Sequence, residues 1–291
     1  MALCIEITPE CIKHTIYGYR PNPFANGFFA VFFAICFGIH IWLGLRFRTK
    51  GYAIALTIGC LALVLGYLAR VAQYFRPFDA IPFQAQVCCL IIAPAFNSAA
   101  IYLMLKHIVE LFGPKWSLLK PKQYTVIFVA ADVISLLLQA TGGALAVLAG
   151  ENKDQLELGN NVMMGGIAFQ VFTLTTFAML AVLFLVRRVR ARPSNPLPTS
   201  ALETWHSIKF RWFLSGLVTA FTTIYIRCVY RIAEMRGGWG NPLMRDQIAF
   251  IILEGCMILV ATLAQTILHP GYFFTTMAGL QMKSGIRTSL I

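Results

Sequence analysis

Seven long apolar runs divide this chain, and they restrict its fold more than any other feature of the sequence. A helix needs about 20 mainly apolar residues to cross a hydrocarbon core of about 30 Å. Because lipid offers no partner to unpaired backbone groups, each run is predicted to form a transmembrane helix in one all-α, polytopic bundle. The runs are Ala25–Leu45, Tyr52–Leu68, Gln84–Leu111, Tyr124–Ala149, Asn161–Leu185, Phe213–Ile232 and Gln247–Leu268.

The composition supports a membrane rather than water as the solvent. Of the 291 residues, 58% are apolar and only 12% are charged, whereas a soluble domain usually carries about 25% charged residues. The net charge of +12 resides on basic residues between the apolar runs, so it indicates topology rather than nucleic-acid binding. We predict an N-terminal segment over 1–24, a seven-helix domain over 25–271 and a tail over 272–291.

The distribution of basic residues predicts the orientation. With the N-terminus outside and the C-terminus in the cytoplasm, Lys and Arg favour the cytoplasmic segments by about two to one, as the positive-inside rule requires. The predicted cytoplasmic set is Arg46, Arg48, Lys50, Lys115, Lys120, Lys122, Arg187, Arg188, Arg190, Arg192, Lys209, Arg211, Lys283 and Arg287.

Polar side chains inside the apolar runs are the candidates for a functional site. An ionised group near a helix centre costs about 2.5–3.5 kcal/mol by insertion scales, so it needs a partner, water or a function. Counting about 1.5 Å of rise per residue puts one set of these groups between the midplane and the outer face. We expect the set to line a polar, substrate-binding cavity, with Arg227 paired to Glu254. Its members are Asp132, Gln139, Gln170, Arg227 and Glu254.

Other interpretations of the polar residues stay open. Gln, Asn and Ser often form hydrogen bonds between transmembrane helices without any further function. Nearer the outer surface, Arg70, Arg231 and Glu234 are predicted to form structural ion pairs. Cys4 and Cys11 precede the first run and form a possible disulfide if the N-terminus faces an oxidising compartment.

Pairs of small residues predict where helices pack closely, and several common metal and cofactor motifs are absent from the sequence. Gly142-Gly143 and Gly165-Gly166 are expected to allow close helix packing. No Cys/His spacing is typical of a zinc site, and no phosphate-binding glycine loop, nucleophile elbow or HExxH motif is present. We therefore expect neither a metal nor a cofactor.

A series of short motifs runs along the chain in order. The motifs are Tyr17-Gly18-Tyr19-Arg20-Pro21, Gly66-Tyr67 with Arg70, Ala93-Pro94 with Tyr102, Asp132 with Ser135, Gln139 and Gly142-Gly143, Gly166 with Gln170, Ile226-Arg227, Tyr230-Arg231, Glu234 with Gly238, and His269-Pro270. Together they resemble the fungal RTA-like family of lipid-translocating exporters over residues of about 17 to 271. The resemblance implies a seven-helix protein of a fungal plasma or internal membrane. Members are associated with export or flipping of sphingoid long-chain bases and phospholipids, with resistance to toxic amphiphiles and, in one branch, with porphyrin traffic.

Three classes of function follow from these observations. The first is translocation of an amphipathic, lipid-like molecule, in which Asp132 and Glu254 attract an ammonium headgroup. The second is an intramembrane enzyme that uses the same two carboxyl groups as general acid and base on a lipophilic substrate. The third is a seven-helix receptor or sensor, which topology alone permits. The expected partners are membrane lipids and a small amphiphile, not nucleic acid, and the oligomeric state stays open.

Overall fold

The computed structural model describes residues 9–12, 15, 17–150, 152–191, 199–237 and 241–273. Within these residues the chain consists of helices joined by short turns, without a β-strand. Cys4, with part of the predicted segment 1–24, and most of the predicted tail 272–291 lie outside the described residues. The division itself and the Cys4–Cys11 disulfide therefore stay predictions.

Seven spans of the described chain are long and apolar enough to cross a membrane, which confirms the predicted number. The chain is an integral membrane protein. Six of the spans are single helices: α2 (Pro23–Phe47), α3 (Lys50–Phe75), α4 (Ala80–Phe112), α5 (Pro121–Leu148), α6 (Lys153–Arg190) and α8 (Ile208–Arg236). The seventh is composite and joins α9 (Gln247–Ala249), the π-helix η2 (Phe250–Cys256) and α10 (Met257–Ile267). The short elements are α1 (Pro9–Ile12), η1 (Pro114–Trp116), α7 (Thr199–His206) and α11 (Pro270–Phe273).

The helices extend beyond the apolar runs that predicted them. α6 begins at Lys153 rather than at Asn161, because the Asn152 side chain accepts hydrogen bonds from the backbone N–H groups of Asp154 and Gln155 and caps the helix. Hydropathy detects only the part of a helix that lies in hydrocarbon, and polar turns continue into the headgroup region. α7 lies in the long connection after α6 and was not predicted.

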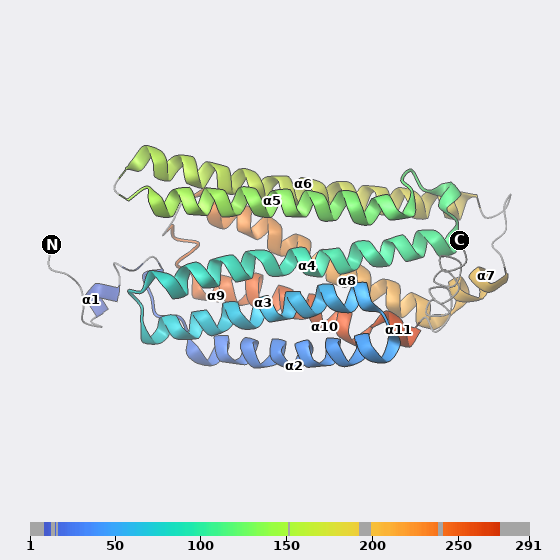
Figure 1. The fold of residues 1–291 in the computed structure, drawn as a ribbon, viewed down its shortest axis with the longest axis horizontal. Coiled ribbons are helices and arrows are strands. Elements are labelled where there is room, and N and C mark those ends of the chain that lie inside the picture. The colour runs from blue at the N-terminus through green and yellow to red at the C-terminus, as the bar shows by residue number, and fades with distance from the viewer. Residues whose placement is uncertain are drawn as a thin grey trace, which may run out of the picture.

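The helices pack in chain order around α4 (Figure 1). α2 packs on α3 and α3 on α4, while α5 and α6 form a hairpin on the other side of α4; α8 packs against α10 behind them. Tyr102 of α4 joins the two groups, since its ring centroid lies 5.5 Å from that of Phe128 on α5 and 4.6 Å from that of Phe177 on α6. The aromatic core thus fixes α4 at the centre of the bundle.

The two glycines of each pair act differently from each other. A β-carbon at Gly166 would lie 2.9 Å from the Ser135 carbonyl oxygen, so this glycine permits the close contact of α5 with α6, as expected. Gly143 and Gly165 have no atom within 4 Å of such a carbon and therefore serve no close contact. Gly143 instead faces open space between α4 and α5.

Candidate functional site

The five predicted substrate-binding residues are all buried inside the bundle rather than facing lipid. Asp132, Arg227 and Glu254 are at most 3% exposed. The thiol of Cys228 lies close enough to these three to interact electrostatically with each of them. Gln139 and Gln170 form a second group, in which the Gln139 amide donates to the Gln170 oxygen at 3.3 Å between α5 and α6.

Arg227 is held by a carboxylate and by a backbone carbonyl that a proline has left free. Its Nη2 donates to Glu254 Oε1, and the same nitrogen donates to the Leu90 carbonyl at 2.6 Å. In a regular helix Leu90 would accept from the N–H of residue 94, but that residue is Pro94, which has none. The guanidinium therefore compensates both a buried carboxylate and a carbonyl in the membrane interior.

Glu254 lies in a π-helical turn that the sequence analysis did not predict. The seventh span is regular up to Ala249, widens over Phe250–Cys256 and is regular again from Met257. Such turns occur mostly as single insertions and frequently at functional sites. Here the widened turn contains the carboxylate that pairs with Arg227.

Asp132 is the buried carboxylate that keeps an oxygen available. Its Oδ2 accepts a hydrogen bond from Ser98 Oγ at 3.0 Å, while Oδ1 has no partner among the described residues. Tyr102 and Cys228 lie beside the same carboxyl group. No basic side chain is paired with it within the described chain.

The residues predicted as outer ion pairs form two different arrangements. Arg231 and Glu234 pair at 2.8 Å, one turn apart on α8. Arg70, in contrast, donates to the Tyr19 hydroxyl at 2.6 Å and places its guanidinium carbon 3.6 Å from the Phe250 ring centroid. The segment before α2 is thereby tied to α3 and to the seventh span.

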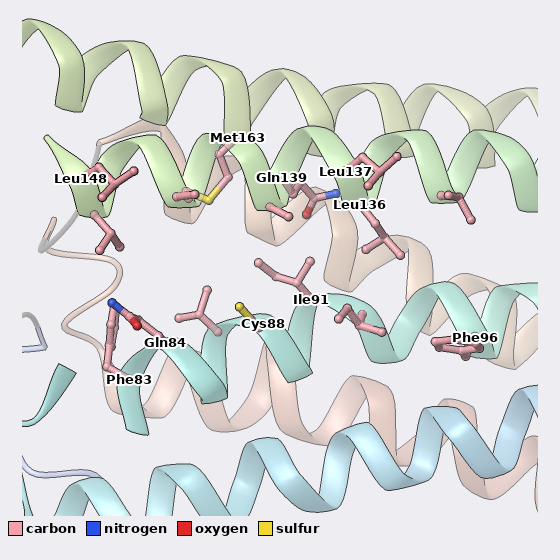
Figure 2. A pocket seen from close by; sticks show the side chains of 17 residues that line it. Phe83, Gln84, Cys88, Ile91, Phe96, Leu136, Leu137, Gln139, Leu148 and Met163 are labelled. Atoms are coloured by element: carbon pink, nitrogen blue, oxygen red, sulfur yellow. The ribbon is translucent and has the colours of Figure 1, made fainter. Parts of the chain in front are cut away.

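A groove of about 750 Å³ separates α4 from α5 (Figure 2). Its α4 side runs from Phe83 to Phe96, which at 1.5 Å per residue is about 20 Å, or two thirds of a hydrocarbon core. Leu137, Val147 and Leu148 line it and remain exposed, so the groove is open toward lipid. Its walls are Phe83, Gln84, Val87, Cys88, Ile91, Ile92 and Phe96 of α4, Val133, Leu136, Leu137, Gln139, Ala140, Gly143, Ala144, Val147 and Leu148 of α5, and Met163 of α6.

The groove differs from the polar cavity that the sequence suggested. Of the five predicted residues only Gln139 lines it, and Asp132 directly precedes Val133 at its inner end. The charged groups are absent from its walls because they lie elsewhere between the helices: Arg227 pairs with Glu254, and Asp132 accepts a hydrogen bond from Ser98 of α4. A signal for the groove was present in the small residues Ala140, Gly143 and Ala144, which share one face of α5.

A second polar cluster in the other half of the bundle was also missed. His40 Nε2 lies 3.0 Å from Thr266 Oγ1, and the Gln265 amide donates to the Asn97 carbonyl at 3.2 Å. His40 and Gln265 are polar residues within apolar runs, which is the signal that identified the other five. Within the described residues, no group of three or more His, Cys, Asp or Glu side chains is arranged to hold a metal ion.

Comparison with known proteins agrees with this architecture. A family model described as RTA1 like protein matches residues 56–277, which include six of the seven spans in whole or in part. The chain belongs to the RTA1-like family. Among RTA1-like relatives, the Sphingoid long-chain base transporter RSB1 of Saccharomyces cerevisiae strain Lalvin EC1118 is 33% identical over 94% of this chain and 78% of its own length.

Two further relatives are more distant. The Lipid-translocating exporter-like protein RTA1 of Leptosphaeria maculans is 26% identical over 89% of this chain and 52% of its own length. Protein RTM1 of Saccharomyces cerevisiae is 25% identical over 78% of this chain and 71% of its own length. No solved structure matches the chain.

Proposed function

We propose that this protein moves single-chain amphipathic lipids, such as sphingoid long-chain bases, across the membrane. The observation that carries the proposal is the α4–α5 groove, which is apolar, open to lipid and long enough for most of an alkyl chain. The names of two relatives, a sphingoid long-chain base transporter and a lipid-translocating exporter-like protein, support the same class of substrate.

In this proposal the polar residues beside the groove serve the headgroup. Asp132 directly precedes Val133, which lines the inner end of the groove, and one of its carboxylate oxygens has no partner among the described residues, so it is the group that attracts an ammonium. Gln139 lines the groove itself and offers a hydrogen-bonding amide to a hydroxyl group. Gln170, which is hydrogen-bonded to Gln139, supports the two headgroup residues from inside the bundle. The buried Arg227–Glu254 ion pair does the same. In this scheme Arg227 neutralises Glu254, which favours transport over the alternative of acid–base catalysis by Asp132 and Glu254.

The orientation belongs to the same proposal. The α2–α3 and α4–α5 connections lie at one end of the bundle, and the α3–α4 and α5–α6 connections lie at the other. Basic residues concentrate at the first end, which the positive-inside rule assigns to the cytoplasm. The described basic residues of that end are Arg46, Arg48, Lys50, Lys115, Lys120, Lys122, Arg187, Arg188, Arg190, Lys209 and Arg211.

Asp132→Asn is expected to lower export of a labelled long-chain base by about tenfold in cells with matched surface levels. The substitution keeps the shape and the hydrogen bond from Ser98 but removes a charge, and hydrogen bonds to charged groups contribute about 1.5–3 kcal/mol. Export of the fatty alcohol of the same chain length, which has no ammonium, should change less than twofold. Equal losses for the base and the alcohol would argue against an ammonium site at Asp132.

A further inference from the structure

A smaller pocket of about 200 Å³ lies where the segment before α2 meets the α3–α4 turn. Phe83 lines both this pocket and the α4–α5 groove, so the two spaces share this residue as a wall. We call it the tyrosine pocket. Its walls are Thr15, Tyr17, Tyr19, Pro21, Gln73, Pro77, Phe78, Asp79, Ala80 and Phe83.

Gln73 supplies a hydrogen-bond acceptor that the described part of the chain leaves unused. Its side chain is only 4% exposed, and its Oε1 has no hydrogen-bond partner among the described residues. Buried polar atoms are nearly always paired in native proteins, so an unpaired oxygen in a pocket wall points to a missing donor. A ligand hydroxyl or ammonium group is such a donor.

The two tyrosines supply oriented hydroxyl groups. Gln86 Nε2 donates to the Tyr17 hydroxyl at 2.6 Å, and Arg70 Nη2 donates to the Tyr19 hydroxyl at 2.6 Å. Since each hydroxyl already accepts one hydrogen bond, its own hydrogen is left for a ligand. Burial raises the pKa of both tyrosines above the usual value, so both stay protonated.

Asp79 is the one charged residue in the described wall of the pocket. It precedes α4, but its side chain caps no backbone N–H of that helix. Its contact with Arg76 is a surface ion pair at 3.7 Å between half-exposed or exposed side chains, which holds the carboxylate only weakly. Two further arginines nearby do not pair with Asp79: Arg20 donates to the Tyr74 carbonyl, and Arg70 donates to the Tyr19 hydroxyl and lies against Phe250.

We propose that the tyrosine pocket binds the amino-alcohol headgroup of a single-chain lipid while the alkyl tail lies in the α4–α5 groove. The ammonium group contacts Asp79, and the hydroxyl groups contact Gln73 and the two tyrosines. Phe83 is the boundary between headgroup and tail. The inference rests on the proposed function and adds a second headgroup position, at the opposite end of the groove from Asp132.

The test is equilibrium binding of a labelled long-chain base to the purified full-length protein in lipid nanodiscs. Asp79→Asn and Gln73→Leu are each expected to weaken binding of the base about fivefold. Asp79→Asn should leave binding of the fatty alcohol of the same length within twofold of wild type. The matched control is Asp154→Asn, which removes an exposed carboxylate from the first turn of α6 at the same end of the bundle and should change nothing.

The outcomes separate this inference from the proposed function. Wild-type binding of the base by both Asp79→Asn and Gln73→Leu would overturn the headgroup assignment and leave the groove intact. An equal loss for base and alcohol in Asp79→Asn would overturn it as well, because it would indicate a structural effect. Asn is as good as Asp before a helix, so this variant should fold normally. If the wild-type protein itself binds no base, the proposed function fails.

Discussion

Cells that express Gly143→Phe are expected to export a labelled long-chain base about tenfold more slowly than cells that express the wild type. A β-carbon at Gly143 meets no atom within 4 Å, so the new ring extends into the α4–α5 groove without disturbing the helix contacts. An alkyl tail that loses about ten favourable atom contacts there loses about 1–2 kcal/mol of binding free energy. A loss of about 1.4 kcal/mol corresponds to tenfold weaker binding.

Gly165→Phe is the matched control for this prediction. Gly165 also has no atom within 4 Å of an added β-carbon, but it lies on α6 and does not line the groove. The control should export the base at the wild-type rate when surface levels are equal. Undiminished export by Gly143→Phe would show that the tail does not use this groove.

Arg227→Met is expected to lower the melting temperature of the purified protein in detergent by about 10 °C. Removing one partner of a buried ion pair leaves the other charge uncompensated, at a cost of about 3–5 kcal/mol, and about 1 kcal/mol shifts the melting temperature by about 2–4 °C in a large domain. Arg227 is almost fully buried and pairs with Glu254. The control Arg236→Met, at the exposed end of α8, should change the free energy of unfolding by less than about 0.5 kcal/mol.

The stability lost in Arg227→Met is expected to be restored by further substitutions in the same region. Arg227→Met combined with Glu254→Met removes both charges and should recover most of the stability, because apolar side chains of similar size replace a buried pair well. The Leu90 carbonyl then still lacks a donor. Adding Pro94→Ala supplies the missing backbone N–H and should recover more. If the double variant melts as low as the single one, the ion pair is not the cause of the loss.

The membrane-spanning helices could be predicted from the sequence because hydrocarbon thickness and backbone hydrogen bonding leave few alternatives. The pairing of Arg227 with Glu254 could also be predicted, because an unpaired charge in the membrane is costly and these two opposite charges lie at equal depth. Both arguments depend only on position along a helix and on the cost of a charge in the membrane.

The groove could not be predicted, because it depends on how far two helices separate. Gly142, Gly143, Gly165 and Gly166 look alike in the sequence, yet Gly166 touches a neighbouring helix and Gly143 faces open space. The contact between Arg227 and the Leu90 carbonyl likewise joins residues 137 positions apart. Such facts follow from the rotation and tilt of each helix, which packing between helices decides.

The proposed transport of single-chain lipids is tested most directly with purified protein in liposomes. A labelled long-chain base is added to the outer leaflet, and its arrival in the inner leaflet is followed with a membrane-impermeant quencher. Wild-type vesicles should move the base several-fold faster than protein-free vesicles, and Gly143→Phe vesicles should be close to the protein-free rate. Equal rates in wild-type and protein-free vesicles would contradict lipid translocation by this chain.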